Sequence, residues 1–150
     1  MKNYQGLKAG DMAITLGYYS VGDTRHAKYR IVSGSFTDDG GNFHKLSNNL
    51  FAKLVATNIV FPEWFGAKGD NSTNDHDAIV NCLNSGYKEI HFSRKTYIID
   101  SKLELSNING LIIEGNGAII KDIEPTPIIE DGVSIEFDNC NNCTIKNMIF

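Results

Sequence analysis

Two acidic side chains, Glu136 and Asp138, stand two residues apart in a run with the alternating pattern of a β-strand. Residues two apart on a strand face the same side, with Cα atoms roughly 6.5 Å apart, within the range of paired glycosidase carboxylates. Ile135 and Phe137 are then expected to point inward. Acids on a solvated face also serve solubility alone. We therefore assign no catalytic residue and keep Glu136 and Asp138 as the candidates.

The three cysteines include a Cys-x-x-Cys pair, Cys140 and Cys143, with Cys82 far upstream. A redox pair of this spacing would begin a helix, whereas Thr144 and Ile145 continue as a strand. A zinc site would need two further ligands. The histidines are scattered: His26, His44, His76 and His91. We expect buried apolar cysteines and predict no disulfide framework, no metal site and no cofactor.

The loop over residues 66–75 carries Asp70, Ser72 and Asn74 at the spacing of the first ligands of an EF-hand calcium loop. Asp75 and Asn81, however, stand where such a loop needs Gly and Glu, and no Gly-Lys-Ser/Thr run offers a phosphate site. We predict a structural loop in which the glycines allow a tight turn and the polar side chains tie it to a following helix. The residues given this role are Gly66, Gly69, Asp70, Thr73 and Asp75.

The composition is that of an ordinary soluble chain: 150 residues, 41% hydrophobic and 21% charged, with a net charge of −4. The basic residues are scattered, which argues against a nucleic-acid partner. No apolar run approaches the roughly 20 residues that span a bilayer, and the first residues do not resemble a signal peptide. We therefore expect no membrane insertion.

Short β-prone runs fill the N-terminal part of the chain. Residues 12–19 and 28–32 read as a hairpin, and further strands are expected at 43–46 and 50–55. Pro62 excludes a central-strand role for the connector at 57–63, so we place a boundary near residue 60.

One helix is predicted after the loop, with Asn74 as N-cap, Gly86 beyond its end and an apolar stripe that includes Ile79 and Leu83. After Gly86 the apolar residues recur at every second position, which is typical of β-strands. The strands expected there are 88–92, 96–99, 102–105, 111–114, 118–121, 133–137 and 144–150.

An internal repeat joins two of these regions. Residues 107–115 align without gaps on 139–147, an offset of 32, with apolar residues on apolar residues and Asn on Asn at two places, 107/139 and 109/141. Stacked repeats bury one another's apolar faces, and Asn at a corner accepts left-handed geometry and bonds to its equivalent above or below. We expect a coil of strands, with 123–131 as a loop that lengthens one rung.

The run Phe-Gly-Ala-Lys-Gly-Asp-Asn at 65–71, followed by Asp-Ala-Ile at 77–79, resembles the opening motif of the pectate-lyase-like superfamily. The strand Glu-Ile-His-Phe at 89–92 and the runs at 96–99 and 113–118 are also similar to that family. Asn71 and Asn74 replace the usual Gly and Asp. The resemblance covers residues 61–150 and implies a helix that caps a right-handed parallel β-helix.

Upstream, residues 17–23, 29–31 and 39–46 are similar to the module that precedes the β-helix in many bacteriophage tailspike and tail-fibre proteins. The resemblance implies an all-β fold, with a virion-side attachment module at 1–60, a capping helix, and the first rungs of an incomplete β-helix at 61–150. It further implies a homotrimer on the phage tail that acts outside the cell. Its expected partners are tail or baseplate proteins and a bacterial surface glycan bound through downstream residues.

Two other functions stay open at this point. The first is a polysaccharide lyase or hydrolase whose carboxylates lie mostly beyond residue 150. The second is a secreted bacterial β-helix adhesin. We expect no glycan cleavage from residues 1–150, and the sequence leaves open whether the full-length protein is an enzyme.

Overall fold

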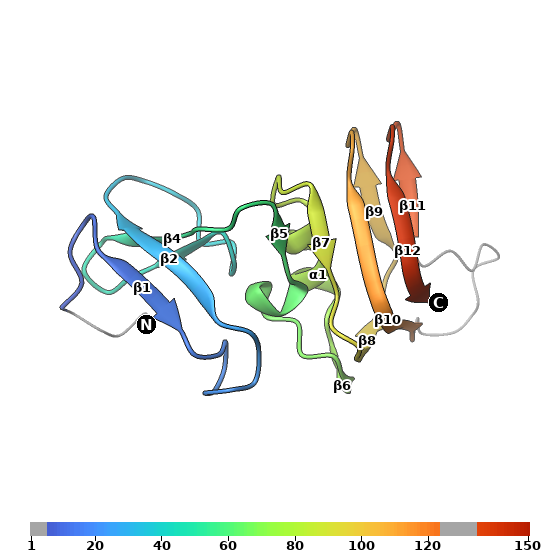
Figure 1. Cartoon of the computed structure of the whole chain (residues 1–150), viewed down its shortest axis with the longest axis horizontal. Helices are drawn as coiled ribbons and strands as arrows, with labels where there is room; N and C mark the ends of the chain where they lie inside the picture. The colour runs from blue at the N-terminus through green and yellow to red at the C-terminus, as the bar shows by residue number, and fades with distance from the viewer. Residues whose placement is uncertain (1–5, 124–134) are drawn as a thin grey trace.

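The computed structural model describes residues 6–123 and 135–150. The described chain is mostly β, with a four-stranded antiparallel sheet followed by a curled parallel sheet. Figure 1 shows the first sheet at one end of the long axis and the later strands of the second sheet at the other. Between them lie η1 (Pro62–Phe65), a short 3-10 helix, and α1 (His76–Leu83).

The N-terminal sheet has the spatial order β1-β2-β4-β3. Its strands are β1 (Met12–Thr15), β2 (Ala27–Val32), β3 (Phe43–Lys45) and β4 (Phe51–Leu54). β2 alternates strictly: Tyr29 and Ile31 are buried while Arg30 is exposed, so one face of the sheet supplies the core.

The predicted hairpin is confirmed, because β1 pairs antiparallel with β2. β1 is nevertheless shorter than predicted and ends at Thr15. The carboxylate of Asp23 accepts hydrogen bonds from the backbone N–H groups of Tyr18 (2.8 Å), Tyr19 (2.7 Å) and Ser20 (2.9 Å). These bonds hold residues 18–20 in a turn, so β1 ends although strand propensity alone predicts that it continues.

The curled parallel sheet has the order β5-β7-β10-β8-β6, and β12 also pairs with β10. Its strands are β5 (Ile59–Val60), β6 (Asp70–Asn74), β7 (Glu89–His91), β8 (Thr96–Ile99), β10 (Ile112–Asp122) and β12 (Thr144–Ile149). A separate parallel pair is formed by β9 (Leu103–Ser106) and β11 (Ile135–Asp138). β5 pairs with β7, so this sheet begins just before the predicted boundary at residue 60.

The chain returns to the same sheet repeatedly, after unequal intervals. Ile112 pairs with Glu89, 23 residues back, and Thr144 pairs with Ile112, 32 residues back. The second offset is that of the internal repeat, and β11 keeps it against β9. The runs predicted at 111–114 and 118–121 form one strand, β10, with a register shift between Glu114 and Ala118. Most of the predicted 123–131 loop lies outside the described residues.

Asparagines form the predicted corner contacts. Asn107 and Asn139 both have a positive φ, 57° and 49°, and the side-chain amide of Asn139 donates to Oδ1 of Asn107 at 2.6 Å. At the next corner the amide of Asn142 donates to Oδ1 of Asn109 at 3.1 Å. Each bond joins one strand layer to the next. The internal repeat therefore predicted the register and the contact between Asn107 and Asn139, whereas the bond between Asn109 and Asn142 joins residues one position out of the alignment.

α1 buries Ile79, Cys82 and Leu83 and packs against η1 and β9. Its N-cap residue is Asp75, one position later than the predicted Asn74. The Asn74 side chain instead accepts a hydrogen bond from the N–H of His76. Gly86 adopts a positive φ of 85° beyond the helix end, as predicted. In the described part of the chain, no helix is long and apolar enough to cross a membrane.

Candidate functional site

The predicted loop residues lie where η1, β6 and α1 meet. Gly66 ends η1 with a φ of 104°, and Gly69 has a φ of 60°. A Cβ on Gly69 would approach Cβ of Lys95 to 2.8 Å and the ring of Tyr97 to 2.9 Å. Glycine is therefore required here both for its conformation and for the close approach of β8.

Asp75 ties this loop together. Its buried carboxylate accepts hydrogen bonds from the N–H groups of Lys68 (2.6 Å) and Gly69 (3.0 Å), while its own N–H donates to the carbonyl of Ile98. Burial raises the pKa of Asp75, and the two backbone bonds act in the opposite direction. Because the carboxylate faces the loop, it does not cap α1.

Asp70 closes a smaller turn on itself. Its carboxylate accepts hydrogen bonds from the N–H and Oγ of Ser72 and from the N–H and Oγ1 of Thr73. The Thr73 bonds above all hold the pKa of Asp70 well below its usual range. Asn71 has a φ of 58°, a left-handed conformation that Gly adopts readily and Asn also accepts. Asp70 and Thr73 were predicted to connect the loop to the start of the helix. That connection is made by Asp75, which precedes α1 and binds the N–H groups of Lys68 and Gly69.

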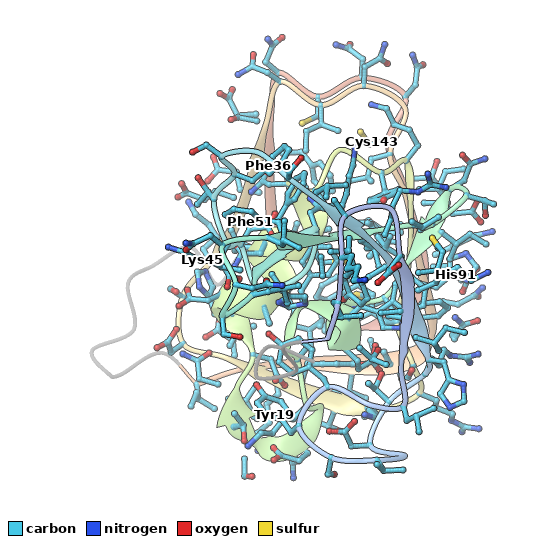
Figure 2. All side chains as sticks on the ribbon, turned by 90° about the vertical axis from the view of Figure 1, so that its left-hand side faces the viewer. Tyr19, Phe36, Lys45, Phe51, His91 and Cys143 are labelled. Atoms are coloured by element: carbon cyan, nitrogen blue, oxygen red, sulfur yellow. The ribbon has the colours of Figure 1, made fainter. Side chains whose placement is uncertain are left out.

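Aromatic side chains join the two sheets. The hydroxyl of Tyr19 donates to the carbonyl of Gly66 at the end of η1 (2.8 Å), whereas that of Tyr18 donates to the carbonyl of Gly40 within the N-terminal part (2.9 Å). The indole N–H of Trp64 donates to the carbonyl of Arg25 (3.1 Å). Burial raises the pKa of Tyr18 to about 12, so this donor stays protonated at neutral pH. Figure 2 views the molecule from the side of the N-terminal sheet, with Tyr19 near the bottom of the view and Phe36 near the top.

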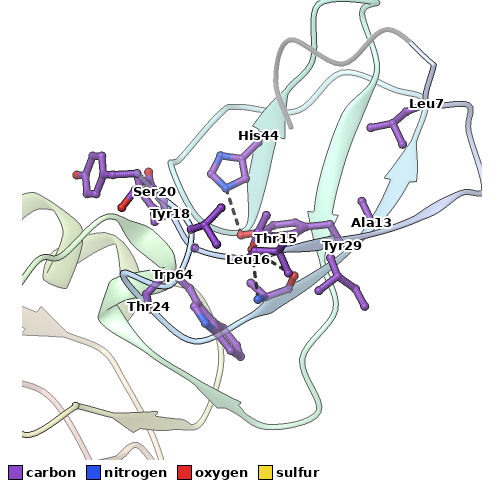
Figure 3. Close-up of a pocket in the computed structure, with 15 residues that line it drawn as sticks. Leu7, Ala13, Thr15, Leu16, Tyr18, Ser20, Thr24, Tyr29, His44 and Trp64 are labelled. Atoms are coloured by element: carbon purple, nitrogen blue, oxygen red, sulfur yellow. Dashed lines mark hydrogen bonds between the residues drawn. The ribbon is translucent and has the colours of Figure 1, made fainter.

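A groove of about 840 Å³ runs along the N-terminal sheet beside β1. Figure 3 shows Trp64 from η1 on one side of it and the hydrogen-bonded pair Tyr29 and His44 on another. Large apolar side chains stay exposed here: Ile14 is 60% exposed and Leu16 50%. β1 is an edge strand of the sheet. An exposed apolar patch on a strand edge is typical of a protein–protein contact surface.

Glu136 and Asp138 are both exposed on β11. The carboxylate of Glu136 binds the ammonium of Lys102, which also lies 3.4 Å from the carboxylate of Glu104 on β9. The bond to Glu136 is the main cause of a raised pKa for Lys102. Ile135 and Phe137 pair with the buried Leu103 and Leu105 and so face the inner side, as predicted. Phe137 is nevertheless 36% exposed, because no described strand pairs with β11 on the side away from β9.

The cysteines are free in this structure. Cys82 is buried in α1, and burial raises the pKa of its thiol. The thiols of Cys140 and Cys143 donate to backbone carbonyls and pack against the core. Among the described residues, no group of three or more His, Cys, Asp or Glu side chains is arranged to hold a metal ion.

Comparison with known proteins gives structural likeness only. No protein-family profile matches the chain, and no curated protein sequence matches it. The enzymatically active domain of tailspike protein 2 from bacteriophage CBA120 superposes with a TM-score of 0.74 at 20% identity, over 98% of this chain and 21% of that one. The chain has a tailspike-related fold.

One further tailspike and a full-length structure of tailspike protein 2 support this similarity. The tailspike protein of Acinetobacter baumannii phage AM24 superposes with a TM-score of 0.66 at 15% identity, over 79% of this chain and 21% of that one. The full-length tailspike protein 2 of an Escherichia coli O157:H7 bacteriophage gives 0.57 at 18% identity, over 93% of this chain and 19% of that one. The chain thus spans about a fifth of the length of these proteins.

Proposed function

We propose that residues 1–150 form the N-terminal part of a phage tailspike, which places and trimerises a glycan-recognising shaft at the virion tail. The observation that carries this proposal is the superposition over 98% of the chain, which includes both sheets and the junction between them. A common sheet alone would match many proteins. A match across two sheets joined in the same order is far more specific.

The curled sheet, in this proposal, is the beginning of a right-handed parallel β-helix. The successive parallel pairings of β5, β7, β10 and β12 support it, as do the asparagine contacts at the corners. α1 would then cap the coil, because its buried face lies against η1 and β9. The predicted downstream glycan contacts would lie on later rungs.

The groove beside β1 is the surface that we propose for subunit contact. We expect light scattering on the full-length protein to give the mass of a trimer. Replacing Ile14 by Ser should shift the mass toward the monomer, because the exposed apolar side chain contributes buried area only in the assembly. Assembly of residues 1–150 alone should be weaker.

Lys121→Ser provides the matched control, since Lys121 is exposed on β10 in the other sheet. It should leave the mass unchanged. A folded monomer of the full-length protein, with folding shown by circular dichroism, would contradict the trimer proposal. If Ile14→Ser leaves the trimer mass unchanged, the groove beside β1 is not part of the subunit contact.

A second candidate function is polysaccharide depolymerisation, favoured by the neighbour described as an enzymatically active domain. We still expect no cleavage by residues 1–150. A glycosidase needs two carboxylates across a substrate groove, about 5 to 10 Å apart, and Glu136 is already bound to Lys102 on an exposed strand.

The measurement is an assay of reducing ends and unsaturated products after incubation with capsule, teichoic acid or pectin-type polymers. The polymer without protein is the blank. Turnover that disappears in Glu136→Gln or Asp138→Asn would make the enzyme the first function and these two residues its carboxylates.

A further inference from the structure

The outer face of the N-terminal sheet carries a row of basic and apolar side chains that crosses all four strands. Directly opposite residues of paired strands point to the same side of a sheet. Arg30 on β2 pairs with Met12 on β1 and with Lys53 on β4. Lys53 pairs in turn with Phe43 on β3. Arg30 and Lys53 are exposed, whereas their neighbours along the strands are buried, so the row lies on the solvent side.

The cations of this face have no acidic partner in the described part of the chain. Lys45 lies two positions beyond the row on β3, so it is exposed on the same side. Among the described residues, no carboxylate forms an ion pair with the side chain of Arg30, Lys45 or Lys53. The carboxylate of Asp38 accepts a hydrogen bond from the backbone N–H of Lys45 and lies 3.7 Å from Nδ1 of His44.

Apolar surface lies beside these cations. Phe36 stacks on Phe43 with ring centroids 4.4 Å apart, and it is still 41% exposed. A groove of about 280 Å³ is lined by Phe43 and Lys53 on one side and by Ser85 and Tyr87, which follow α1, on the other. The ammonium of Lys53 lies 5.9 Å from the centroid of the Phe43 ring. The face therefore offers a groove and an exposed ring together with positive charge.

We propose that this basic face, formed by Arg30, Phe36, Phe43, Lys45 and Lys53, binds an acidic segment of a partner protein that also carries apolar side chains. Carboxylates would pair with cations that have no partner in the described chain, and an apolar side chain would enter the groove beside Phe43. None of the five residues lines the groove beside β1, so the two surfaces are separate. In a tailspike the partner would be a protein of the tail, and this last step alone rests on the proposed function.

The charge distribution of the chain favours a short acidic segment over a nucleic acid. Residues 1–60 contain seven Lys or Arg and four Asp or Glu, whereas residues 61–150 contain seven and fourteen. A long polyanion laid along the molecule would be repelled by the acidic part. A segment that covers only the N-terminal sheet would not be.

The test is a titration of the ¹⁵N-labelled 150-residue chain with the acetylated peptide Glu-Phe-Glu-Glu-Phe-Glu, followed by NMR. We expect the peptide to shift the amide signals of residues 43–45 and 51–55. The double variant Arg30→Gln, Lys53→Gln should bind it about tenfold more weakly, because two exposed ion pairs are lost. Both side chains are exposed, so this variant should fold, which circular dichroism checks.

The matched control is Lys88→Gln, Lys121→Gln, which removes the same charge from exposed positions at β7 and β10 and should leave binding unchanged. The peptide Glu-Ser-Glu-Glu-Ser-Glu should bind about threefold more weakly or worse, because it has no apolar side chain for the groove.

The proposal is overturned if the aromatic peptide shifts none of these signals at about 5 mM, or if the Arg30 and Lys53 variant binds it as tightly as the unaltered chain. It is also overturned if the two peptides bind equally, or if a short DNA duplex binds this face more tightly than the aromatic peptide. Each of these results leaves the trimer mass, which tests the proposed function, unaffected.

Discussion

Replacing Ile79 by Ala lowers the free energy of unfolding by about 2–5 kcal/mol. Ile79 is fully buried on α1, where the helix packs against η1 and β9, and the substitution leaves a cavity that the surrounding strands cannot fill. Leu83→Ala should have an effect of the same order, because Leu83 is buried on the same face. Urea denaturation followed by circular dichroism measures both.

Asp77→Ala is the control on the same helix. The Asp77 side chain is 99% exposed and contacts only the ring of His76, so its loss should cost far less. Equal and negligible losses for Ile79→Ala and Asp77→Ala would mean that the helix lies free on the surface and does not cap the curled sheet.

Replacing Gly115 by Ala should destabilise the protein for a steric reason, whereas Gly110 in the same repeat is needed only for its backbone conformation. A Cβ on Gly115 would lie 2.4 Å from the backbone oxygen of Asn147 on β12. Since backbone atoms cannot move aside cheaply, we expect a loss of about 1–3 kcal/mol or more, together with weakened pairing of β10 and β12. Urea denaturation gives the free energy, and amide exchange reports on the pairing.

Gly110 is the matched control in the same repeat. It has a φ of 74° and open space around its Cα. Gly110→Asn should be nearly neutral, because Asn142 adopts a φ of 53° at the aligned position. Gly115→Asn should destabilise the protein, although Asn147 stands at the position aligned with Gly115. Equal tolerance at both glycines would contradict the close approach of β12 to β10.

Contacts that repeat along the chain could be predicted from the sequence. The offset of 32 gave the register of β12 on β10, because matched apolar and Asn positions have the same structural role in each layer. The corner asparagines followed from the same alignment. The loop glycines and Asn71 could be predicted because a positive φ restricts which residue types are accepted.

Contacts that a side chain makes only once, with no repeat of the pattern elsewhere in the chain, could not be predicted. The N-cap moved from Asn74 to Asp75 because the Asp75 carboxylate binds a loop that no local pattern places beside it. β1 ended early because Asp23 captures three amides of the following turn. A cavity between the two sheets brings Tyr19, Glu63 and Lys95 together, and their spacing in the sequence carries no sign of that.

The direction of the parallel pairing bears on how the chain is made. β7, β10 and β12 each pair with a strand that precedes them in the chain. The paired residues are 23 to 32 positions apart in the sequence. During synthesis each new strand therefore meets a template that has already left the ribosome. Folding can advance layer by layer without waiting for distant residues, and the entropy lost in closing each loop stays nearly constant as strands are added to the curled sheet.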